Sequence, residues 1–226
     1  MILAAGRGER MRPLTDSTPK PLLKVGGKAL IAWHLENLSK AGIKEVVINH
    51  AHLGEQIVNT LGNGQQWGMS IQYSAEKIAL ETAGGIANAL PLLGNEIFLV
   101  VNGDIYTEMD FSACQMQAKT MQQQNKLAHL FLVDNPAQHA QGDFALNADL
   151  VEADGPSKLT FSGVGIYHPH LFASVTRGQP AKLAPILREA MVRHQVSGEH
   201  YRGEWHDIGT PERLSALNTQ LSNQLF

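Results

Sequence analysis

Cysteine is almost absent from this sequence, which contains only Cys114 among its 226 residues. A single cysteine cannot form an internal disulfide, and such sparse use fits a reducing compartment. Long apolar runs are absent too, and the run from Ile97 to Val101 is far shorter than a membrane-spanning helix. Arg7 interrupts the apolar start before the apolar stretch of a signal peptide could form. We therefore expect a soluble, cytoplasmic protein without a membrane partner.

An excess of positive charge is also missing, because 18 lysines and arginines stand against 21 aspartates and glutamates, giving a net charge of −3. The composition thus gives no support to a broad basic surface, and we expect no nucleic-acid partner. Apolar residues make up 43% and charged residues 17%, which is typical of globular proteins. A chain of this length can bury the core of one large α/β domain.

The most informative segment that is present is a glycine-containing turn near the N-terminus. Gly6 and Gly8 interrupt the short apolar run at the start, and glycine lets backbone N–H groups approach a ligand closely. Such amides, with a helix N-terminus behind them, can bind phosphate anions. Four cations follow the first glycine, Arg7, Arg10, Arg12 and Lys20. Arginine and lysine complement phosphate oxygens, so this segment predicts a binding site for a triphosphate.

Two familiar phosphate-binding loops do not match this segment. The dinucleotide fingerprint requires a third glycine where Met11 stands, and a Walker-type loop requires serine or threonine where Ala29 follows Lys28. The remaining alternative is a surface turn whose arginines are merely solvated. The combination of small residues, three arginines and a lysine between two prolines favours the phosphate site.

The rest of the chain alternates strands with helices. Helices are expected over residues 29–41, 54–61, 83–93, 111–125, 182–194 and 211–221, and strands over 45–49, 69–73, 97–101, 127–133, 142–147, 159–167 and 199–208. This order predicts an α/β fold that is Rossmann-like, with a mixed, mainly parallel sheet and helices on both faces. The pattern becomes richer in strands from about residue 140. Ligands of such sheets bind at the carboxyl ends of the strands.

The N-terminal segment resembles the signature of the sugar-1-phosphate nucleotidyltransferases. The matching residues are Leu3-Ala4-Ala5-Gly6-x-Gly8-x-Arg10-Met11-x-Pro13-Leu14-Thr15 and Pro19-Lys20-Pro21-Leu22. The resemblance implies a GT-A-like nucleotidyltransferase fold in one domain, with a nucleotide-binding part over 1–135 and a sugar-binding part over 136–226. It also implies a Mg²⁺-dependent reaction in which a nucleoside triphosphate and a sugar 1-phosphate give a nucleotide sugar and pyrophosphate.

Two aspartates match the metal ligands of that family. Asp104 follows the apolar strand and Asn102-Gly103, and Asp207 lies in Trp205-His-Asp207-Ile-Gly-Thr-Pro, which resembles the Trp-x-Asp-x-Gly-Thr motif of the family. Mg²⁺ commonly takes one or two carboxylates together with phosphate oxygens and water. The alternative for each aspartate is a helix cap or turn, although Thr210 is better placed to cap the final helix.

The resemblance also assigns the nucleotide contacts. Lys20 is expected to contact the α-phosphate, and Arg10 with the loop amides the β- and γ-phosphates; with Asp104 and Asp207 these two form the expected catalytic set. The expected nucleotide-binding residues are Ala5, Gly6, Arg7, Gly8, Glu9, Arg10, Lys20, Glu76, Thr82, Gly84, Gly85 and Asn102. For Gly84 and Gly85, close helix packing is the competing explanation. The acidic side chain of Glu76 suits a pyrimidine imide poorly. The sequence therefore gives little indication of which nucleotide base is bound.

The sugar-binding positions carried over from the family are Asn102, Asp143, Ser162, Gly163, Lys182, Glu199 and Arg202. The sequence departs from many relatives here. The Glu-Lys pair common in this region is missing, and the segment 149–159 is shorter than in those relatives. A second catalytic lysine is therefore in doubt, with Lys182 as a substitute. The alternative interpretation is that Asp143 and Glu199 are ordinary carboxylates of a turn or a strand edge without a role in sugar binding.

Three functions remain open at this point. Residues 197–203 resemble the branch of the family that uridylylates N-acetylmuramic acid α-1-phosphate with UTP in peptidoglycan recycling. The second function is the same chemistry on glucose 1-phosphate or another hexose 1-phosphate, with dTTP, UTP or GTP. The third is a catalytically inactive sensor of nucleotide sugars, which the joint presence of Arg10, Lys20, Asp104 and Asp207 disfavours.

Overall fold

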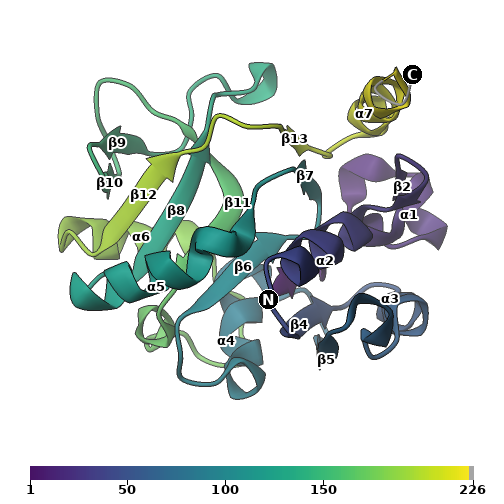
Figure 1. Ribbon diagram of the computed structural model, residues 1–226, viewed down its shortest axis with the longest axis horizontal. Helices are drawn as coiled ribbons and strands as arrows, with labels where there is room; N and C mark the ends of the chain where they lie inside the picture. The colour runs from purple at the N-terminus through teal and green to yellow at the C-terminus, as the bar shows by residue number, and fades with distance from the viewer. Residues whose placement is uncertain (224–226) are drawn as a thin grey trace. The chain divides into compact units, whose positions relative to one another are not determined.

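The computed structural model describes residues 1–223 (Figure 1). These residues form two compact units that alternate along the chain. Unit 1 contains Met1, Leu80–Val101 and Ser112–Gly203. Unit 2 contains Ile2–Ala79, Asn102–Phe111 and the segment that begins at Glu204. The expected separation of nucleotide-binding and sugar-binding parts at residue 135 concerns ligands and stays a prediction.

Unit 2 is built on three parallel strands in the order β5-β4-β1. They are β1 (Ile2–Leu3), β4 (Glu45–His50) and β5 (Ser70–Ala75). β4 lies in the middle and is buried over residues 46–49, as expected for a strand covered on both faces. Because the three strands run in the same direction, the segments that follow β1, β4 and β5 meet at one edge of the sheet.

Further elements of unit 2 surround these strands. The helices are η1 (Glu9–Met11), α1 (Leu14–Ser17), η2 (Lys20–Leu22), α2 (Leu30–Lys40), α3 (Gly54–Leu61), η3 (Gln65–Trp67) and α7 (Pro211–Asn223), where η marks a 3₁₀ helix. The short strands are β2 (Lys24–Val25), β3 (Lys28–Ala29), β7 (Ile105–Thr107) and β13 (Trp205–Asp207). β2 pairs with β3 and β7 pairs with β13, both antiparallel.

The C-terminal helix α7 is fixed to unit 2 by a hydrophobic cluster. Leu217 and Leu221 of α7 pack with Met11, Leu23, Val25, Leu30, Tyr106 and Ile208. The side chain of Asn218 adds two hydrogen bonds, accepting one from the N–H of Gly26 at 2.8 Å and donating one to the carbonyl of Lys24 at 3.2 Å. The second half of α7 therefore packs against the N-terminal segment of unit 2.

Unit 1 contains a mixed sheet in the order β6-β11-β8-β12-β10-β9. Its strands are β6 (Phe98–Asn102), β8 (Ala128–Val133), β9 (Ala145–Asn147), β10 (Leu150–Glu152), β11 (Thr160–Tyr167) and β12 (Val196–His200). β8 is buried along its whole length, and it pairs parallel with β12 and antiparallel with β11.

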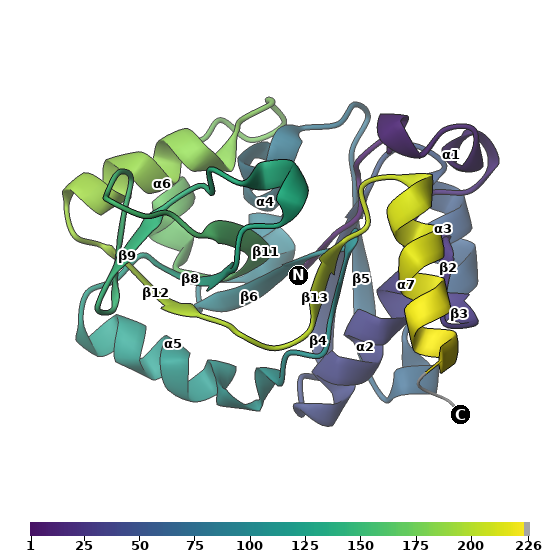
Figure 2. The ribbon, with the colours of Figure 1, turned by 90° about the horizontal axis from the view of Figure 1, so that it is seen from above.

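The helices of unit 1 cover both faces of this sheet. They are α4 (Glu81–Leu93), η4 (Phe111–Ala113), α5 (Cys114–Gln123), η5 (Ala137–His139), η6 (Pro169–Phe172) and α6 (Leu183–Val192). Helix α5 lies on one face, and α4 and α6 lie on the other (Figure 2). The predicted α/β class with a mixed sheet between helices is thus confirmed.

One predicted strand is wrong. Residues 199–208 do not form a single strand, because β12 ends at His200 and β13 begins at Trp205. β12 pairs with β8 of unit 1, whereas β13 pairs with β7 of unit 2. The chain leaves one unit and enters the other over residues 201–204, and no continuous strand can serve both pairings. Across residues 1–223, none of the helices is long and apolar enough to span a bilayer.

Candidate active site

The glycine turn of unit 2 contains a glycine in the left-handed conformation, as the sequence suggested, and it is followed by a very short helix. Gly8 has φ of 69°, and its carbonyl accepts hydrogen bonds from the N–H of Met11 and from Oγ1 of Thr15, both at 2.9 Å. A Cβ at Gly6 would meet no atom within 4 Å, so the turn is open at that point. The helix behind the turn is the three-residue 3₁₀ helix η1 rather than a longer helix, and its dipole is correspondingly short.

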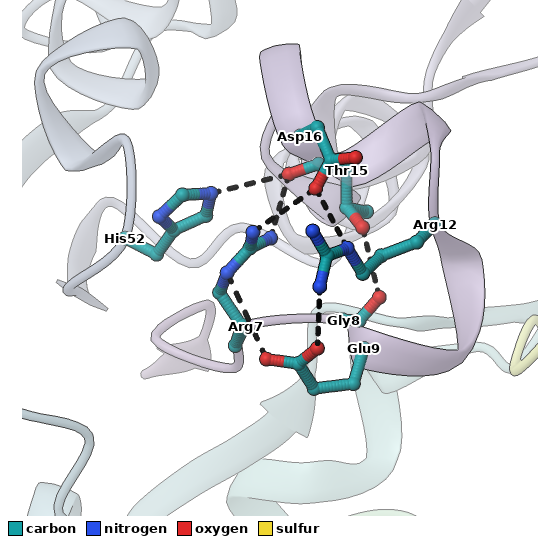
Figure 3. Close-up of polar contacts among 7 residues, drawn as sticks. All are labelled: Arg7, Gly8, Glu9, Arg12, Thr15, Asp16 and His52. Carbon is teal, nitrogen blue, oxygen red and sulfur yellow. Dashed lines mark hydrogen bonds and ion pairs between the residues drawn. The ribbon is translucent and has the colours of Figure 1, made fainter.

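Two of the arginines stabilise the turn itself (Figure 3). Arg7 donates to the carbonyl of Thr15 at 2.8 Å and to Asp16 at 3.1 Å, and Arg12 donates to Asp16 at 2.8 Å. Asp16 is partly desolvated, which acts to raise its pKa, but the hydrogen bonds and charges of both arginines lower that pKa overall. His52 also contacts the carbonyl of Thr15, at 3.1 Å. These contacts connect Arg7 and Arg12 to Thr15 and Asp16 of α1.

Arg10 differs from its two neighbours. Its side chain is exposed, and it forms no ion pair or hydrogen bond within residues 1–223. The loop therefore presents one uncommitted guanidinium, from the residue that the family resemblance assigns to phosphate.

Lys20 and Asp104 form the central ion pair of the site. Lys20 is only 7% exposed, and its Nζ lies 2.6 Å from Oδ2 of Asp104. Asp104 is brought there by Gly103, whose N–H donates to the carbonyl of Leu3 at 2.8 Å. A Cβ at Gly103 would lie 2.7 Å from that same oxygen, so only glycine permits the close approach to β1. The half-buried Asn102 precedes this turn.

Asp207 is placed beside Asp104 by the pairing of β13 with β7. The pairing sets Asp207 opposite Ile105, and the N–H of Ile208 donates to the carbonyl of Asp104 at 3.1 Å. Asp207 does not cap α7; instead Oγ1 of Thr210 accepts from the N–H of Arg213 at 3.4 Å, as expected for a weak cap. The carboxylate of Asp207 is ion-paired with the side chain of Arg213.

These carboxylates suit a magnesium ion better than a metal that needs a full protein cage. Within the described part of the chain, no three acidic, histidine or cysteine side chains gather into a metal-binding cluster. Mg²⁺ keeps several waters and is commonly held by one or two carboxylates together with substrate phosphates. Two aspartates on adjoining backbone, beside a loop suited to phosphate, fit that description.

Glu76 is held by a residue that the sequence did not single out. Glu76 is 7% exposed and follows β5, and its Oε1 accepts from Nδ2 of Asn49 at 2.6 Å. The Oδ1 of Asn49 accepts from the N–H of Ala4 at 2.8 Å. Asn49 thus links the end of β1, just before Ala5 and Gly6, to Glu76. Its only sequence signal is a polar residue near the end of a buried apolar strand.

Three expected nucleotide contacts belong to unit 1, at the start of α4. Thr82, Gly84 and Gly85 lie in its first turns. The N–H of Gly84 donates to the carbonyl of Ala181 at 3.1 Å, and a Cβ at Gly84 would lie 2.4 Å from the carbonyl of Gln179. Close packing against residues 179–181, the competing explanation, is therefore a sufficient reason for glycine at position 84.

Two of the expected sugar-binding residues of unit 1 are engaged internally. Oδ2 of Asp143 accepts from the N–H of Phe161 at 2.8 Å, and Oγ of Ser162 accepts from the N–H of Val164 at 3.1 Å. Ser162 is 1% exposed, and the neighbouring Gly163 has φ of 82°. Both side chains serve the local backbone in this conformation.

The other three expected sugar contacts of unit 1 are exposed. Glu199 lies on β12 with its side chain 55% exposed, and its carboxylate stands 3.7 Å from Nε2 of His129. Lys182 precedes α6 as its N-cap, and Arg202 follows β12. Burial lowers the pKa of His129 to about 4, so this histidine is neutral beside Glu199 at neutral pH. Glu199, Lys182 and Arg202 are thus the freely presented polar groups among the expected sugar contacts.

Two proteins of the same name match this chain over nearly its full length. The chain is 56% identical to the N-acetylmuramate alpha-1-phosphate uridylyltransferase of Neisseria meningitidis over 95% of this chain and 94% of that protein. It is 33% identical to the enzyme of the same name from Caulobacter vibrioides over 98% of this chain and 96% of that protein.

Solved structures share the fold at low sequence identity. The apo form of a UDP-glucose pyrophosphorylase matches with a TM-score of 0.77 at 18% identity, covering 100% of this chain and 98% of that one. HddC from Yersinia pseudotuberculosis, solved with GMP-PN, matches with a TM-score of 0.76 at 18% identity and 97% coverage of both chains. The family model described as nucleotidyl transferase matches residues 1–224. The chain therefore belongs to the nucleotidyl transferase family, whose members transfer a nucleotide to a sugar 1-phosphate.

Proposed function

We propose that this protein transfers the uridylyl group of UTP to N-acetylmuramic acid α-1-phosphate, with release of pyrophosphate. The choice of sugar and base is supported by the 56% identical Neisseria protein, which carries that activity in its name and matches over nearly its full length. The reaction returns a cell-wall sugar to the nucleotide-activated form, and peptidoglycan recycling is the role we propose for it.

The observation that carries the proposal is the convergence of four charged side chains in unit 2. Lys20 and Asp104 form a 2.6 Å ion pair, Asp207 lies on the strand paired beside Asp104, and Arg10 extends from the glycine turn. A Cβ at Gly209 would stand 3.1 Å from Oδ1 of Asp207 and 3.2 Å from Nη2 of Arg10. Residues that are far apart in the sequence thus surround one small region.

The chemistry follows from the charges of the reactants. A sugar 1-phosphate is already an anion, and its attack on the α-phosphorus needs no strong base. The protein must instead align two anions that repel each other and balance the charge that develops on the transferred group and on pyrophosphate. Lys20 would bind the α-phosphate, while Arg10 and the amides of the glycine turn would bind the β- and γ-phosphates. The internal contacts of Arg7 and Arg12 with Thr15 and Asp16 would hold the turn in place for these phosphates and so reduce the reorganisation needed.

We propose Mg²⁺ as the cofactor, held by Asp104 and Asp207. A bound Mg²⁺ supplies Lewis-acid neutralisation of phosphate charge. The donor set supports this choice, because two carboxylates are what Mg²⁺ usually takes from a protein in sites that also bind phosphate. Because Asn49 bridges Ala4 and Glu76, we assign Asn49 the role of keeping Glu76 and the glycine turn in register for the base. In unit 1, Glu199, Lys182 and Arg202 are the proposed contacts for the sugar hydroxyls and the lactyl carboxylate.

A substrate panel tests the proposal. Pyrophosphate release is measured with UTP, dTTP or GTP, each paired with N-acetylmuramic acid, N-acetylglucosamine or glucose α-1-phosphate. The highest kcat/KM is expected for UTP with the muramic sugar. Faster turnover of N-acetylglucosamine 1-phosphate or glucose 1-phosphate would reject the sugar assignment, and absence of pyrophosphate release with every pair would reject an active enzyme.

A further inference from the structure

We propose that Arg213 is a counter-cation for the metal ligand Asp207: it occupies that carboxylate when no metal is bound and thereby makes metal binding depend on the nucleotide. Arg213 lies outside the motif through which the sequence pointed to Asp207. The inference rests on the proposed function only in taking Asp207 as a metal ligand.

The position of Arg213 is set by the start of α7. Helix α7 begins at Pro211, so Arg213 lies in its first turn and its side chain reaches back toward the preceding strand. It is ion-paired with Oδ2 of Asp207, and its Nη1 lies 3.5 Å from the carbonyl oxygen of Asp207. The side chains of Arg213 and Asp207 are 26% and 28% exposed, so the pair is partly shielded from water.

Gly209 makes room for this arrangement. A Cβ there would lie 2.8 Å from Nη1 of Arg213, 3.1 Å from Oδ1 of Asp207 and 3.2 Å from Nη2 of Arg10. Two guanidinium groups and one carboxylate therefore converge where a side chain is missing. Because α7 is fixed by its hydrophobic cluster and by Asn218, Arg213 cannot move away with its helix without disrupting that packing.

The same relation exists at the other aspartate. Asp104 is ion-paired with Lys20, just as Asp207 is with Arg213. Each proposed metal ligand therefore has its own cation, and the two carboxylates can lie on neighbouring backbone without a metal to offset their repulsion. Arginine stays protonated at any physiological pH, so this counter-charge is permanent.

The consequence concerns the order of binding. A dication that enters alone must displace two cations, which then remain nearby and repel it. A triphosphate that enters with the metal brings several negative charges, which can receive both the displaced Lys20 and the displaced Arg213. Metal and nucleotide should therefore bind with strong positive coupling, and Arg213 should contribute a defined part of it.

The test measures Mn²⁺ binding to the full chain without sugar phosphate, by the electron paramagnetic resonance signal of free Mn²⁺. Each signal is compared with that of the same solution without protein, because UTP binds Mn²⁺ by itself. Without nucleotide, Arg213→Gln should bind Mn²⁺ at least about 5-fold more tightly than the wild type, the lower end of typical coupling between sites. Arg213→Lys keeps the charge and should retain weak binding. With UTP present, the difference between Arg213→Gln and the wild type should narrow.

The matched control is Arg193→Gln, which removes an arginine paired with Glu189 on α6 of unit 1 and should leave Mn²⁺ binding unchanged. If Arg213→Gln does not fold, Arg213→Met removes the same charge with more apolar bulk at the start of α7. Unchanged or weaker Mn²⁺ binding by the charge-removing variant would overturn the inference, as would absence of Mn²⁺ binding with and without UTP. Because the measurement involves no turnover, failure of uridylyl transfer in the substrate panel would reject the proposed function and leave this result standing.

Discussion

The N–H of Ile208 donates a hydrogen bond to the carbonyl of Asp104, 3.1 Å away. This bond joins the C-terminal Asp-Ile-Gly-Thr segment to the turn after β6, across about a hundred residues of sequence. It sets Asp207 beside Ile105 and brings two carboxylates to adjoining positions. The proposed metal site thus depends on a two-stranded pairing rather than on a single motif.

Replacing Asp207 with asparagine should abolish most of the activity while leaving the fold intact. The side chain is 28% exposed and forms no part of the hydrophobic cluster below it, so little stability should be lost. We expect kcat to fall by roughly 10²–10³-fold, the range for removing one electrostatic contact to a transition state. Pyrophosphate release and circular dichroism check both halves of this prediction. Near-normal kcat would show that Asp207 does not hold the metal.

Two variants of the central ion pair should differ in stability although both lose activity. Asp104→Asn leaves the ammonium of Lys20, only 7% exposed, without its charged partner. We expect the free energy of unfolding of Asp104→Asn to fall by about 1–3 kcal/mol. The lower end of this range is expected because the side chain of Asp104 is 42% exposed and water can approach the pair. Lys20→Met leaves only a hydrated carboxylate and should be neutral or stabilising. Urea unfolding compares the two; a larger loss for Lys20→Met would contradict the argument.

Alanine substitutions at the two glycines of the turn should separate binding from folding. At Gly8, φ of 69° and a Cβ only 2.9 Å from Cγ2 of Thr15 should cost roughly 1–2 kcal/mol of stability. At Gly6 a methyl group meets no protein atom within 4 Å, so the melting temperature should not change. The methyl would instead occupy the space proposed for UTP, and KM for UTP should rise roughly tenfold, equivalent to about 1.4 kcal/mol. Unchanged KM in Gly6→Ala would place the nucleotide elsewhere.

Stability should decrease in mild acid partly because of His34. Burial in α2 lowers the pKa of His34 to about 4, despite its 2.9 Å hydrogen bond to the carbonyl of Ile105. The unfolded chain takes up this proton near its ordinary pKa of 6.5, whereas the folded protein does so only near pH 4. The free energy of unfolding therefore has its full value, as far as His34 is concerned, above pH 6.5. It falls as the pH drops from 6.5 to about 4 and does not change further below that. The total loss due to His34 is about 3 kcal/mol.

The variant His34→Gln isolates this contribution, because glutamine can still donate to the Ile105 carbonyl but does not titrate. Between pH 7 and pH 5, its free energy of unfolding should fall less steeply than that of the wild type in urea titrations. His194→Gln is the control, since His194 is exposed in the turn after α6 and its replacement should leave the slope unchanged. Equal slopes for wild type and His34→Gln would show that His34 is accessible to protons in the folded state.

The helices and central strands could be predicted from the sequence because their patterns are local. The predicted helix over 54–61 coincides with α3, and the buried strand over 45–49 differs from β4 by one residue. The prediction of one strand over 199–208 was wrong because the two halves of this segment pair with strands of different units. A local apolar pattern does not indicate which strand a segment pairs with. Behind the glycine turn the chain forms only the short helices η1 and α1, for which the sequence analysis made no prediction.

The sequence by itself determined the α/β class, because apolar periodicity and strand ends are written in consecutive residues. It also predicted a phosphate site at the N-terminal turn, from glycine spacing and charge, and two metal-binding aspartates, from the family resemblance. Only the tertiary structure decided that Arg7 and Arg12 hold the turn while Arg10 stays uncommitted, that Asn49 supports Glu76, and that Arg213 neutralises Asp207. Such roles depend on which side chains meet across the fold, and Coulombic and hydrogen-bond energies act over a few ångströms of space whatever the separation in sequence.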